Sequence, residues 1–500
     1  MKEEYVVEAD EIPAKITITT ETDDYVPRYF INRPKIEEPT EAFLSNVKEK
    51  LIMEVNLTEE EYVSSSKLED VKQKFRDKAG EIIDESLPSI EEDSKKILIG
   101  NLLHEMLGIG DLEILLADGK LEEIVINSAQ EPVWTYHKEH GWVKTDLQME
   151  SEDQIKNYAS IIGRRVGKQI SNLHPLLDAH LPSGDRTNAT ISPISTQGNT
   201  ITIRKFARNP WTITDFIKNG TVNAEISALL WLCLQYEMNV LVSGGTGSGK
   251  TSLLGVLLPF IPPNQRIVSI EDTREVSLPD FLHWVPLTTR EPNPEGKGGV
   301  SMLDLLVNSL RMRPDRIIVG EIRREKQAEV LFEAMHTGHS VYSTLHADTA
   351  TQTIRRLKNP PINVPKTLIE AIDLNVVMFR DRRRNIRRAM QLAEVVTDYI
   401  GDTAQIEPNV LYQWMSQKDS IEKKQESQTI FEELSMHAGL TREEIDKSLK
   451  DRKMILNWMV DNSIDEVNTV GKVVAEFYQN EDRVVELVND GADPEDIYSL

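Results

Sequence analysis

The chain has little of what builds disulfides, zinc sites and membrane spans. Its 500 residues include one cysteine, Cys233, so neither an internal disulfide nor a cysteine-based zinc site can form. Cys233 stands in an apolar helical pattern, which predicts a buried thiol, and the scarcity of cysteine fits a reducing compartment. No apolar run reaches the roughly 18 residues of a membrane span. The best stretch, 226–242, is interrupted by Gln235, Glu237 and Asn239.

Positive charge is also scarce. The chain has 57 Lys and Arg against 82 Asp and Glu, a formal net charge of −25, and its isoelectric point is near 4.9. Broad nucleic-acid binding needs a positive surface, so we expect no direct, sequence-specific nucleic-acid binding; the charge favours solubility. The first residues lack the apolar core of a signal peptide. We therefore expect a cytoplasmic protein that is peripheral at the membrane through partners.

The composition and the residue patterns predict four regions. Hydrophobic residues make up 39% and aromatic residues 6% of the chain, ordinary values for a globular protein of two or three domains. Residues 1–117 read as an extended and helical N-terminal region, and 118–208 as an α+β domain. Residues 209–395 alternate short apolar strands with helices, as a parallel, doubly wound sheet does. Residues 396–500 are predicted to be helical and acidic.

A glycine-rich octapeptide carries the clearest chemical signal. It reads Gly244-Gly245-Thr246-Gly247-Ser248-Gly249-Lys250-Thr251, between an apolar strand at 239–242 and a helix predicted over 251–258. Glycines let successive N–H groups point at phosphate oxygens, and a helix N-terminus adds partial positive charge. Lys250 is placed to reach the β- and γ-phosphates, and the Thr251 hydroxyl to ligate Mg²⁺. We predict a nucleoside triphosphate site at this loop, with Ser252 as its last member.

Carboxylates follow two further predicted strands. Glu321 comes after the strand 316–320, and Glu271 and Glu275 come after the strand 266–270. Because the carboxyl ends of parallel strands meet at one edge of a sheet, these residues should lie near the phosphate loop. We expect Glu321 to hold Mg²⁺ or orient the attacking water, and Glu271 to lie at the nucleotide. The pattern does not choose between Glu275 and Glu321 as the general base.

Two histidines bracket the next apolar strand, 340–343. His339 precedes it and His346 follows it. We predict that they contact phosphate or relay its presence between subunits. The alternative is that each is a structural histidine with its hydrogen bonds satisfied.

The ordered set of these segments resembles a known family. The phosphate loop, Glu-Asp-x-x-Glu, Val-Gly-Glu-Ile-Arg, and Thr-Gly-His with Ser-Thr-Leu-His look like the Walker A, Asp box, Walker B and His box of type II and type IV secretion ATPases. The resemblance covers residues 118–395. The missing zinc module points to the archaeal branch, whose motors assemble archaella and archaeal type IV pili. The fold it implies is a RecA-like, α/β P-loop NTPase domain with a parallel sheet, preceded by an α+β domain.

The resemblance also implies partners and further site residues. It implies a homohexameric ring that uses ATP and Mg²⁺ and acts on a polytopic membrane platform protein. It implies arginines given by the N-terminal domain, in cis or across subunits, to a site between the domains. Arg186 and Arg204 stand where such arginines are expected, to stabilise charge in the transition state. The alternative for each is a surface salt bridge.

The sequence leaves open what a cluster of arginines binds. Residues 380–388 hold six arginines and one aspartate. This cluster could bind nucleic acid, anionic lipid headgroups or acidic residues of a neighbouring subunit.

The leading hypothesis for the function is a mechanical ATPase that assembles or rotates a filament. The alternatives are a DNA-transfer ATPase of conjugation-type type IV secretion and a nucleotide-gated scaffold that hydrolyses very slowly.

Overall fold

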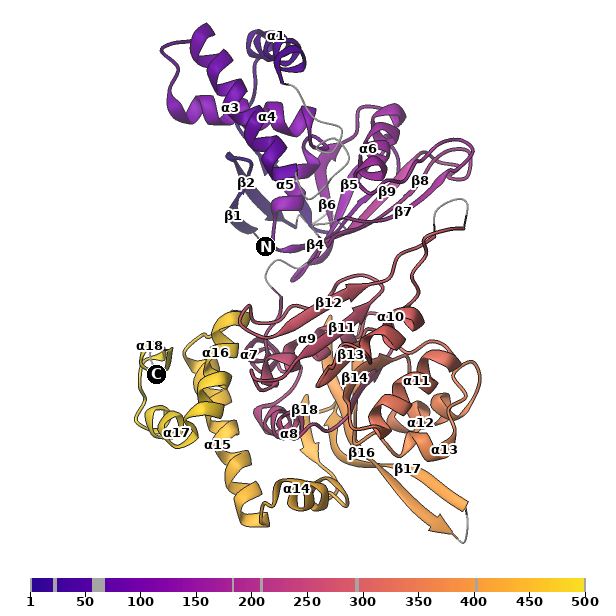
Figure 1. Ribbon diagram of the computed structural model, residues 1–500. Helices are drawn as coiled ribbons and strands as arrows, with labels where there is room; N and C mark the ends of the chain where they lie inside the picture. The colour runs from indigo at the N-terminus through magenta and orange to yellow at the C-terminus, as the bar shows by residue number, and fades with distance from the viewer. Residues whose placement is uncertain are drawn as a thin grey trace. The chain divides into compact units, whose positions relative to one another are not determined.

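The chain forms two compact units, residues 1–208 and 209–500. The computed structural model describes residues 2–20, 25–55, 68–181, 184–206, 210–292, 296–400 and 403–498. Each unit is built on its own sheet of nine strands, and Figure 1 labels the strands and helices of both.

The first unit is a mostly antiparallel sheet with helices packed on it. Its strand order is β1-β2-β3-β6-β5-β4-β9-β8-β7. The strands are β1 (Lys2–Ala9), β2 (Ile12–Thr19), β3 (Arg28–Asn32), β4 (Leu121–Ile126), β5 (Pro132–His137), β6 (Gly141–Gln148), β7 (Leu176–His180), β8 (Arg186–Thr190) and β9 (Thr200–Arg204). The helices are α1 (Glu38–Glu54), α3 (Leu68–Ser86), α4 (Glu92–Met106), α5 (Leu112–Ala117) and α6 (Glu152–Arg165).

This sheet crosses a predicted boundary. Strand β3 pairs with β6 in parallel, with Arg28 opposite Lys144, and thereby joins the first strands to those after residue 118. The sequence predicts a boundary between two regions at residues 117 and 118. In the structure, the strands before and after this point belong to one continuous sheet. The extended character predicted for the first residues is confirmed by β1, β2 and β3.

The second unit holds a mixed sheet in the order β12-β11-β13-β14-β10-β15-β16-β17-β18. The strands from β12 to β15 pair in parallel, and those from β15 to β18 in antiparallel fashion. The strands are β10 (Val240–Gly244), β11 (Ile267–Glu271), β12 (Trp284–Thr288), β13 (Arg316–Val319), β14 (Ser340–Leu345), β15 (Leu374–Asp381), β16 (Ile386–Ile400), β17 (Thr403–Met415) and β18 (Ser420–Lys423). The predicted α/β, RecA-like fold with a parallel sheet is confirmed.

Helices cover both faces of this sheet. They are α7 (Ile213–Lys218), α8 (Ala224–Gln235), α9 (Lys250–Leu257), the 3₁₀ turn η2 (Leu258–Phe260), α10 (Met302–Ser309), α11 (Glu325–His336), α12 (Ala350–Lys358) and α13 (Lys366–Ile369). In strand β10, Val240 and Val242 pack in one core with α8 and α9, whereas Leu241 packs in a second core with α10 and α11. Figure 1 shows α11, α12 and α13 gathered on one side of the sheet. Because β10 is buried on both faces, its first three residues, Val240 to Val242, are all apolar.

The last part of the chain differs from its prediction. The helix expected from residue 396 is wrong as far as residue 423, because β16, β17 and β18 extend the sheet there. Cross-strand pairing decides this: Glu394 to Ile400 align residue by residue with β17, and β-branched residues such as Val395 and Val396 suit a strand. Helices follow only from residue 430, as α14 (Ile430–Ala438), α15 (Arg442–Asp461), α16 (Val467–Gln479), α17 (Glu481–Asn489) and α18 (Pro494–Tyr498).

Two predictions about apolar segments can be compared with the structure directly. Cys233 lies on α8 with no exposed surface, so the predicted buried thiol is confirmed. Over the described ranges, no helix combines the length and the apolar character needed to cross a membrane.

Candidate nucleotide-binding site

The phosphate loop connects the central strand β10 to helix α9. Three of its glycines have positive φ: Gly244 at 151°, Gly247 at 71° and Gly249 at 91°. These are conformations that side chains with a Cβ disfavour. At Gly244 a Cβ would also collide with the carbonyl oxygen of Met378 on β15. Gly249 is the N-cap of α9, so the loop delivers the chain directly into the positive end of that helix.

The backbone of the loop is arranged as an anion receptor. The Ser248 N–H donates to the Gly245 carbonyl at 3.3 Å, which closes the turn, whereas no backbone carbonyl among the described residues accepts from the N–H groups of Gly247, Gly249 or Thr251. The Lys250 ammonium donates to the Gly245 carbonyl at 3.0 Å and so lies folded across the loop. Unused N–H groups beside a lysine and a helix N-terminus are what phosphate binding requires.

A chain of polar contacts leads from this lysine to the end of strand β13. The Lys250 Nζ lies 3.5 Å from His346 Nδ1, and His346 Nε2 lies 3.2 Å from Glu321 Oε1. The other oxygen of Glu321 accepts from Arg323 Nε at 2.8 Å. Arg323 in turn contacts Asp272 Oδ2 at 2.5 Å. The structure therefore brings the predicted Lys250, His346 and Glu321 together at one sheet edge.

The charges fix how His346 is protonated. Burial and the Lys250 ammonium lower the pKa of His346, which favours the neutral ring at neutral pH. With the ammonium facing Nδ1, the ring proton belongs on Nε2, where it donates to Glu321. Burial also lowers the pKa of Lys250, while Glu321, Glu275 and Asp348 favour its charged form. Glu275 is thus electrostatically coupled to the phosphate-loop lysine, as Glu321 is.

Glu271 is a buried carboxyl beneath the site. It is 2% exposed, and its Oε1 accepts from the N–H groups of Glu275 and Val276 at 3.0 and 3.2 Å. Its Oε2 has no hydrogen-bond partner among the described residues. Burial raises its pKa to about 7, despite the two backbone hydrogen bonds. Glu271 therefore acts on the site by fixing the loop that carries Glu275.

The oxygen donors at this edge fit a magnesium ion. The Thr251 hydroxyl and the Glu321 carboxylate are hard donors, the kind that Mg²⁺ prefers. Thr251 is in the first turn of α9 and Glu321 follows β13, so both belong to the edge where the strands of the parallel sheet end. Ser252, the last residue of the predicted set, is exposed in the same turn.

A cavity of about 530 Å³ opens at the loop. It is lined in part by Gly244, Gly245, Thr246 and His346 from the predicted set. The sequence reasoning missed the other lining residues, of which three are charged: Asp348, Arg355 and Arg356. A Cβ on Gly245 would lie 3.1 Å from Asp348 Oδ1. The two arginines belong to α12, whose strongly amphipathic pattern keeps them off the core, whereas Asp348 lies before that helix.

Three predicted residues are not brought to this loop by the second unit. His339 precedes β14 and His346 follows it, so the two lie about 20 Å apart along the strand. The His339 Nδ1 instead lies 3.3 Å from the Ala334 carbonyl oxygen. Arg186 and Arg204 belong to the first unit, where they face each other across β8 and β9. Arg186 also forms an ion pair with Asp178 at 2.8 Å.

Comparison with known proteins supports the resemblance to a secretion ATPase family. The family model described as type II/IV secretion system protein matches residues 114–434. The uncharacterized protein MJ0900 of Methanocaldococcus jannaschii is 36% identical over 397 residues, which cover 78% of this chain and 70% of that protein. The putative conjugal transfer protein Rv3659c of Mycobacterium tuberculosis is 31% identical over 262 residues, 51% of this chain and 73% of that protein.

Solved structures are also similar. The crystal structure of the VirB11 ATPase from the Brucella suis type IV secretion system, in complex with sulphate, is 25% identical, with a TM-score of 0.29. The similarity covers 57% of this chain and 95% of that one. The match of the family model over more than half of the residues, together with the phosphate loop and its acidic partners, shows that this chain belongs to the type II/IV secretion system protein family.

Proposed function

We propose that this protein is an ATPase that hydrolyses ATP at the Gly244–Thr251 loop. The observation that carries the proposal is the contact chain from Lys250 through His346 to Glu321. This chain of contacts links the place where the triphosphate is held to the place where water is activated. It runs from a phosphate-binding lysine through a neutral histidine to a carboxylate. A glycine-rich turn without catalytic use has no need of this arrangement.

In the proposed reaction, water attacks the γ-phosphorus in line with the leaving ADP oxygen, and a carboxylate accepts the proton that the water loses. Lys250 and the loop N–H groups hold the phosphate oxygens. His346 keeps Glu321 oriented through its Nε2–H. Glu275 and Glu321 both remain candidates for the base. Bound Mg²⁺, held by Thr251 and Glu321, would supply positive charge against the phosphate oxygens.

The larger role we propose is that of a motor in a homohexameric ring. Membership in the family and the relative from an archaeon support a machine that assembles or rotates an archaellum or a type IV pilus-like filament, or drives type II/IV secretion, through a polytopic membrane platform protein. Arg186 and Arg204 are proposed to contribute positive charge to hydrolysis. His339 is proposed to take part in the relay between subunits. A ring of six copies by light scattering with an ATP analogue tests this arrangement, and a strict monomer contradicts it.

A second candidate is a DNA-transfer ATPase of conjugation-type secretion. The similarity to a putative conjugal transfer protein favours it, whereas the net charge of −25 counts against direct DNA contact. Titration with DNA at several salt concentrations separates the two. A steep loss of affinity with salt supports phosphate contacts, and no measurable binding supports the filament motor.

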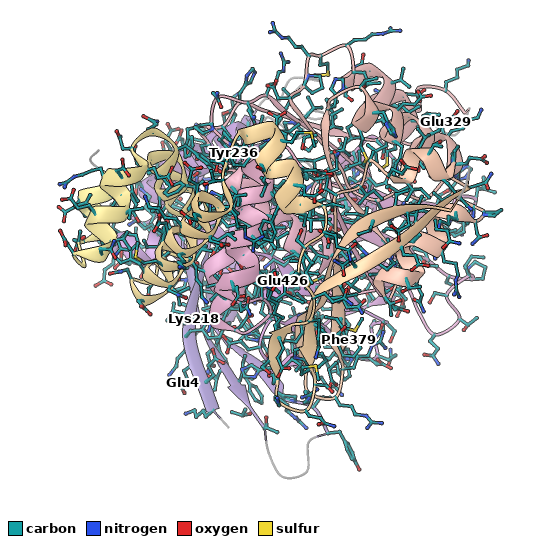
Figure 2. All side chains as sticks on the ribbon, turned by 90° about the horizontal axis from the view of Figure 1, so that it is seen from below. Glu4, Lys218, Tyr236, Glu329, Phe379 and Glu426 are labelled. Carbon is teal, nitrogen blue, oxygen red and sulfur yellow. The ribbon has the colours of Figure 1, made fainter. Side chains whose placement is uncertain are left out.

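Phosphate release from ATP tests the activity itself. Glu321→Gln should bind ATP and release phosphate poorly, whereas Glu329→Gln, an exposed glutamate on α11 that Figure 2 labels, should match the unaltered protein. Normal turnover in Glu321→Gln would assign the role of general base to Glu275. Negligible release by the unaltered protein would favour the nucleotide-gated scaffold and contradict the ATPase proposal.

A further inference from the structure

Two arginines of the 380–388 cluster lie against the phosphate loop. Arg380 on β15 pairs with Arg387 on β16, so their side chains share one face of the hairpin. The Arg387 Nε donates to the Gly247 carbonyl at 3.1 Å. A Cβ on Gly247 would lie 2.9 Å from the guanidinium of Arg380, and one on Gly249 would lie 3.3 Å from Cδ of Arg387.

Two other arginines of the cluster form ion pairs with aspartates instead of contacting the loop. Phe379, labelled in Figure 2, pairs with Arg388 and marks the other face of the hairpin. Arg388 forms an ion pair with Asp419, and Arg384 with Asp381, both at 2.8 Å. By contrast, the Arg387 guanidinium has no carboxylate within ion-pair distance among the described residues. Within the described part of the chain, one of its five N–H donors is used, the Nε that binds Gly247, so the guanidinium retains charge and donors for a ligand.

The strand order determines which part of a nucleotide these arginines meet. Strand β10 has β14 and then β13 on one side, and β15 and then β16 on the other. Glu321 and His346 follow β13 and β14, so the terminal phosphate belongs on that side. The opposite end of the molecule then leaves the loop on the β15 side, where Arg380 and Arg387 lie.

We propose that Arg387, with Arg380 beside it, receives the ribose and base of the nucleotide whose phosphates the loop holds. The inference rests on the proposed ATP site and adds its nucleoside end. A guanidinium suits this role because its plane stacks on a nucleobase and its edge donates to ribose hydroxyls. The contact with the Gly247 carbonyl fixes that plane beside the loop.

Binding of two ligands by the full chain tests the assignment. In Arg387→Met, which keeps the aliphatic stem beside Gly249, ADP affinity should fall about tenfold because a stacked, hydrogen-bonded contact is lost. Affinity for inorganic tripolyphosphate, which has no nucleoside, should not change. Arg384→Met, an alteration in the same hairpin away from the loop, should bind both ligands like the unaltered protein. Calorimetry measures all three proteins, and a thermal melt confirms that each is folded.

The other outcomes are distinct. Unchanged ADP affinity in Arg387→Met overturns the inference and leaves the ATP site intact. An equal loss for ADP and tripolyphosphate also overturns it, because Arg387 would then only hold the loop in shape. If the unaltered protein binds neither ligand, the proposed ATP site itself fails, and the nucleoside assignment fails with it.

Discussion

The Nε2 atom of His346 lies 3.2 Å from Oε1 of Glu321, and this contact sets the direction of the carboxylate at the end of β13. The other nitrogen of the same ring, Nδ1, lies 3.5 Å from Nζ of the phosphate-loop lysine, Lys250. The neutral His346 ring therefore couples the position of Lys250 to the orientation of the Glu321 carboxylate, and the ring itself stays uncharged.

Removing this ring should slow turnover more than it weakens binding. In His346→Ala, Glu321 loses one of its two orienting partners, and a misplaced catalytic group can cost about 100-fold in rate. We expect kcat to fall by roughly that factor with little change in KM. His336→Ala, at the exposed end of α11, is the matched control. A KM effect without a kcat effect would place His346 in binding alone.

The pH dependence of turnover should report the same histidine. The pKa of His346 lies below the ordinary value of 6.5, so the ring is neutral at pH 7 and becomes charged only in more acidic solution. A charged ring would repel the Lys250 ammonium and lose Nδ1 as an acceptor. We therefore expect kcat to fall as the pH drops below 6.5, and this acid limb to be absent in His346→Gln. An identical acid limb in both proteins contradicts the assignment.

Glu271 should make stability depend on pH. Its folded pKa of about 7 lies above the ordinary value of 4.5, so its contribution is fully present below pH 4.5 and is lost as the pH rises through 7. The loss amounts to about 3 kcal/mol at most. Glu271→Gln cannot ionise at this position. The difference between its melting temperature and that of the unaltered protein should therefore shift in favour of the variant as the pH rises from 5 to 8. A constant difference between the two would show that Glu271 ionises as easily folded as unfolded.

The sequence was sufficient for those parts of the site that are local in the chain. The phosphate loop depends on glycines within eight residues. Glu271 ends one apolar strand and Glu321 follows another, and the parallel pairing of these two strands brings their ends together. His346 entered the prediction for the same reason. His339 precedes the same strand and so lies at its opposite end from His346, and its role between subunits stays a prediction.

What the sequence could not supply was long-range pairing. Arg387 reaches the loop 140 residues away only because β15 pairs with both β10 and β16. The end of β16 and all of β17 and β18 fall in the region predicted to be helical, because the pairing of these strands with one another cannot be seen in the residue pattern of each one alone. Arg355 on α12 and Asp348 before that helix line the cavity because the fold brings them beside the loop. Their positions in the sequence do not predict that contact.

The most direct measurement is ADP binding by calorimetry to the unaltered protein and to Lys250→Ala. The account predicts that the alanine variant loses at least about 100-fold in affinity, because a buried charge facing the phosphates is removed. Lys326→Ala, an exposed lysine on α11, should bind ADP normally. Equal affinity of the Lys250→Ala variant and the unaltered protein would contradict the claim that this loop grips the nucleotide.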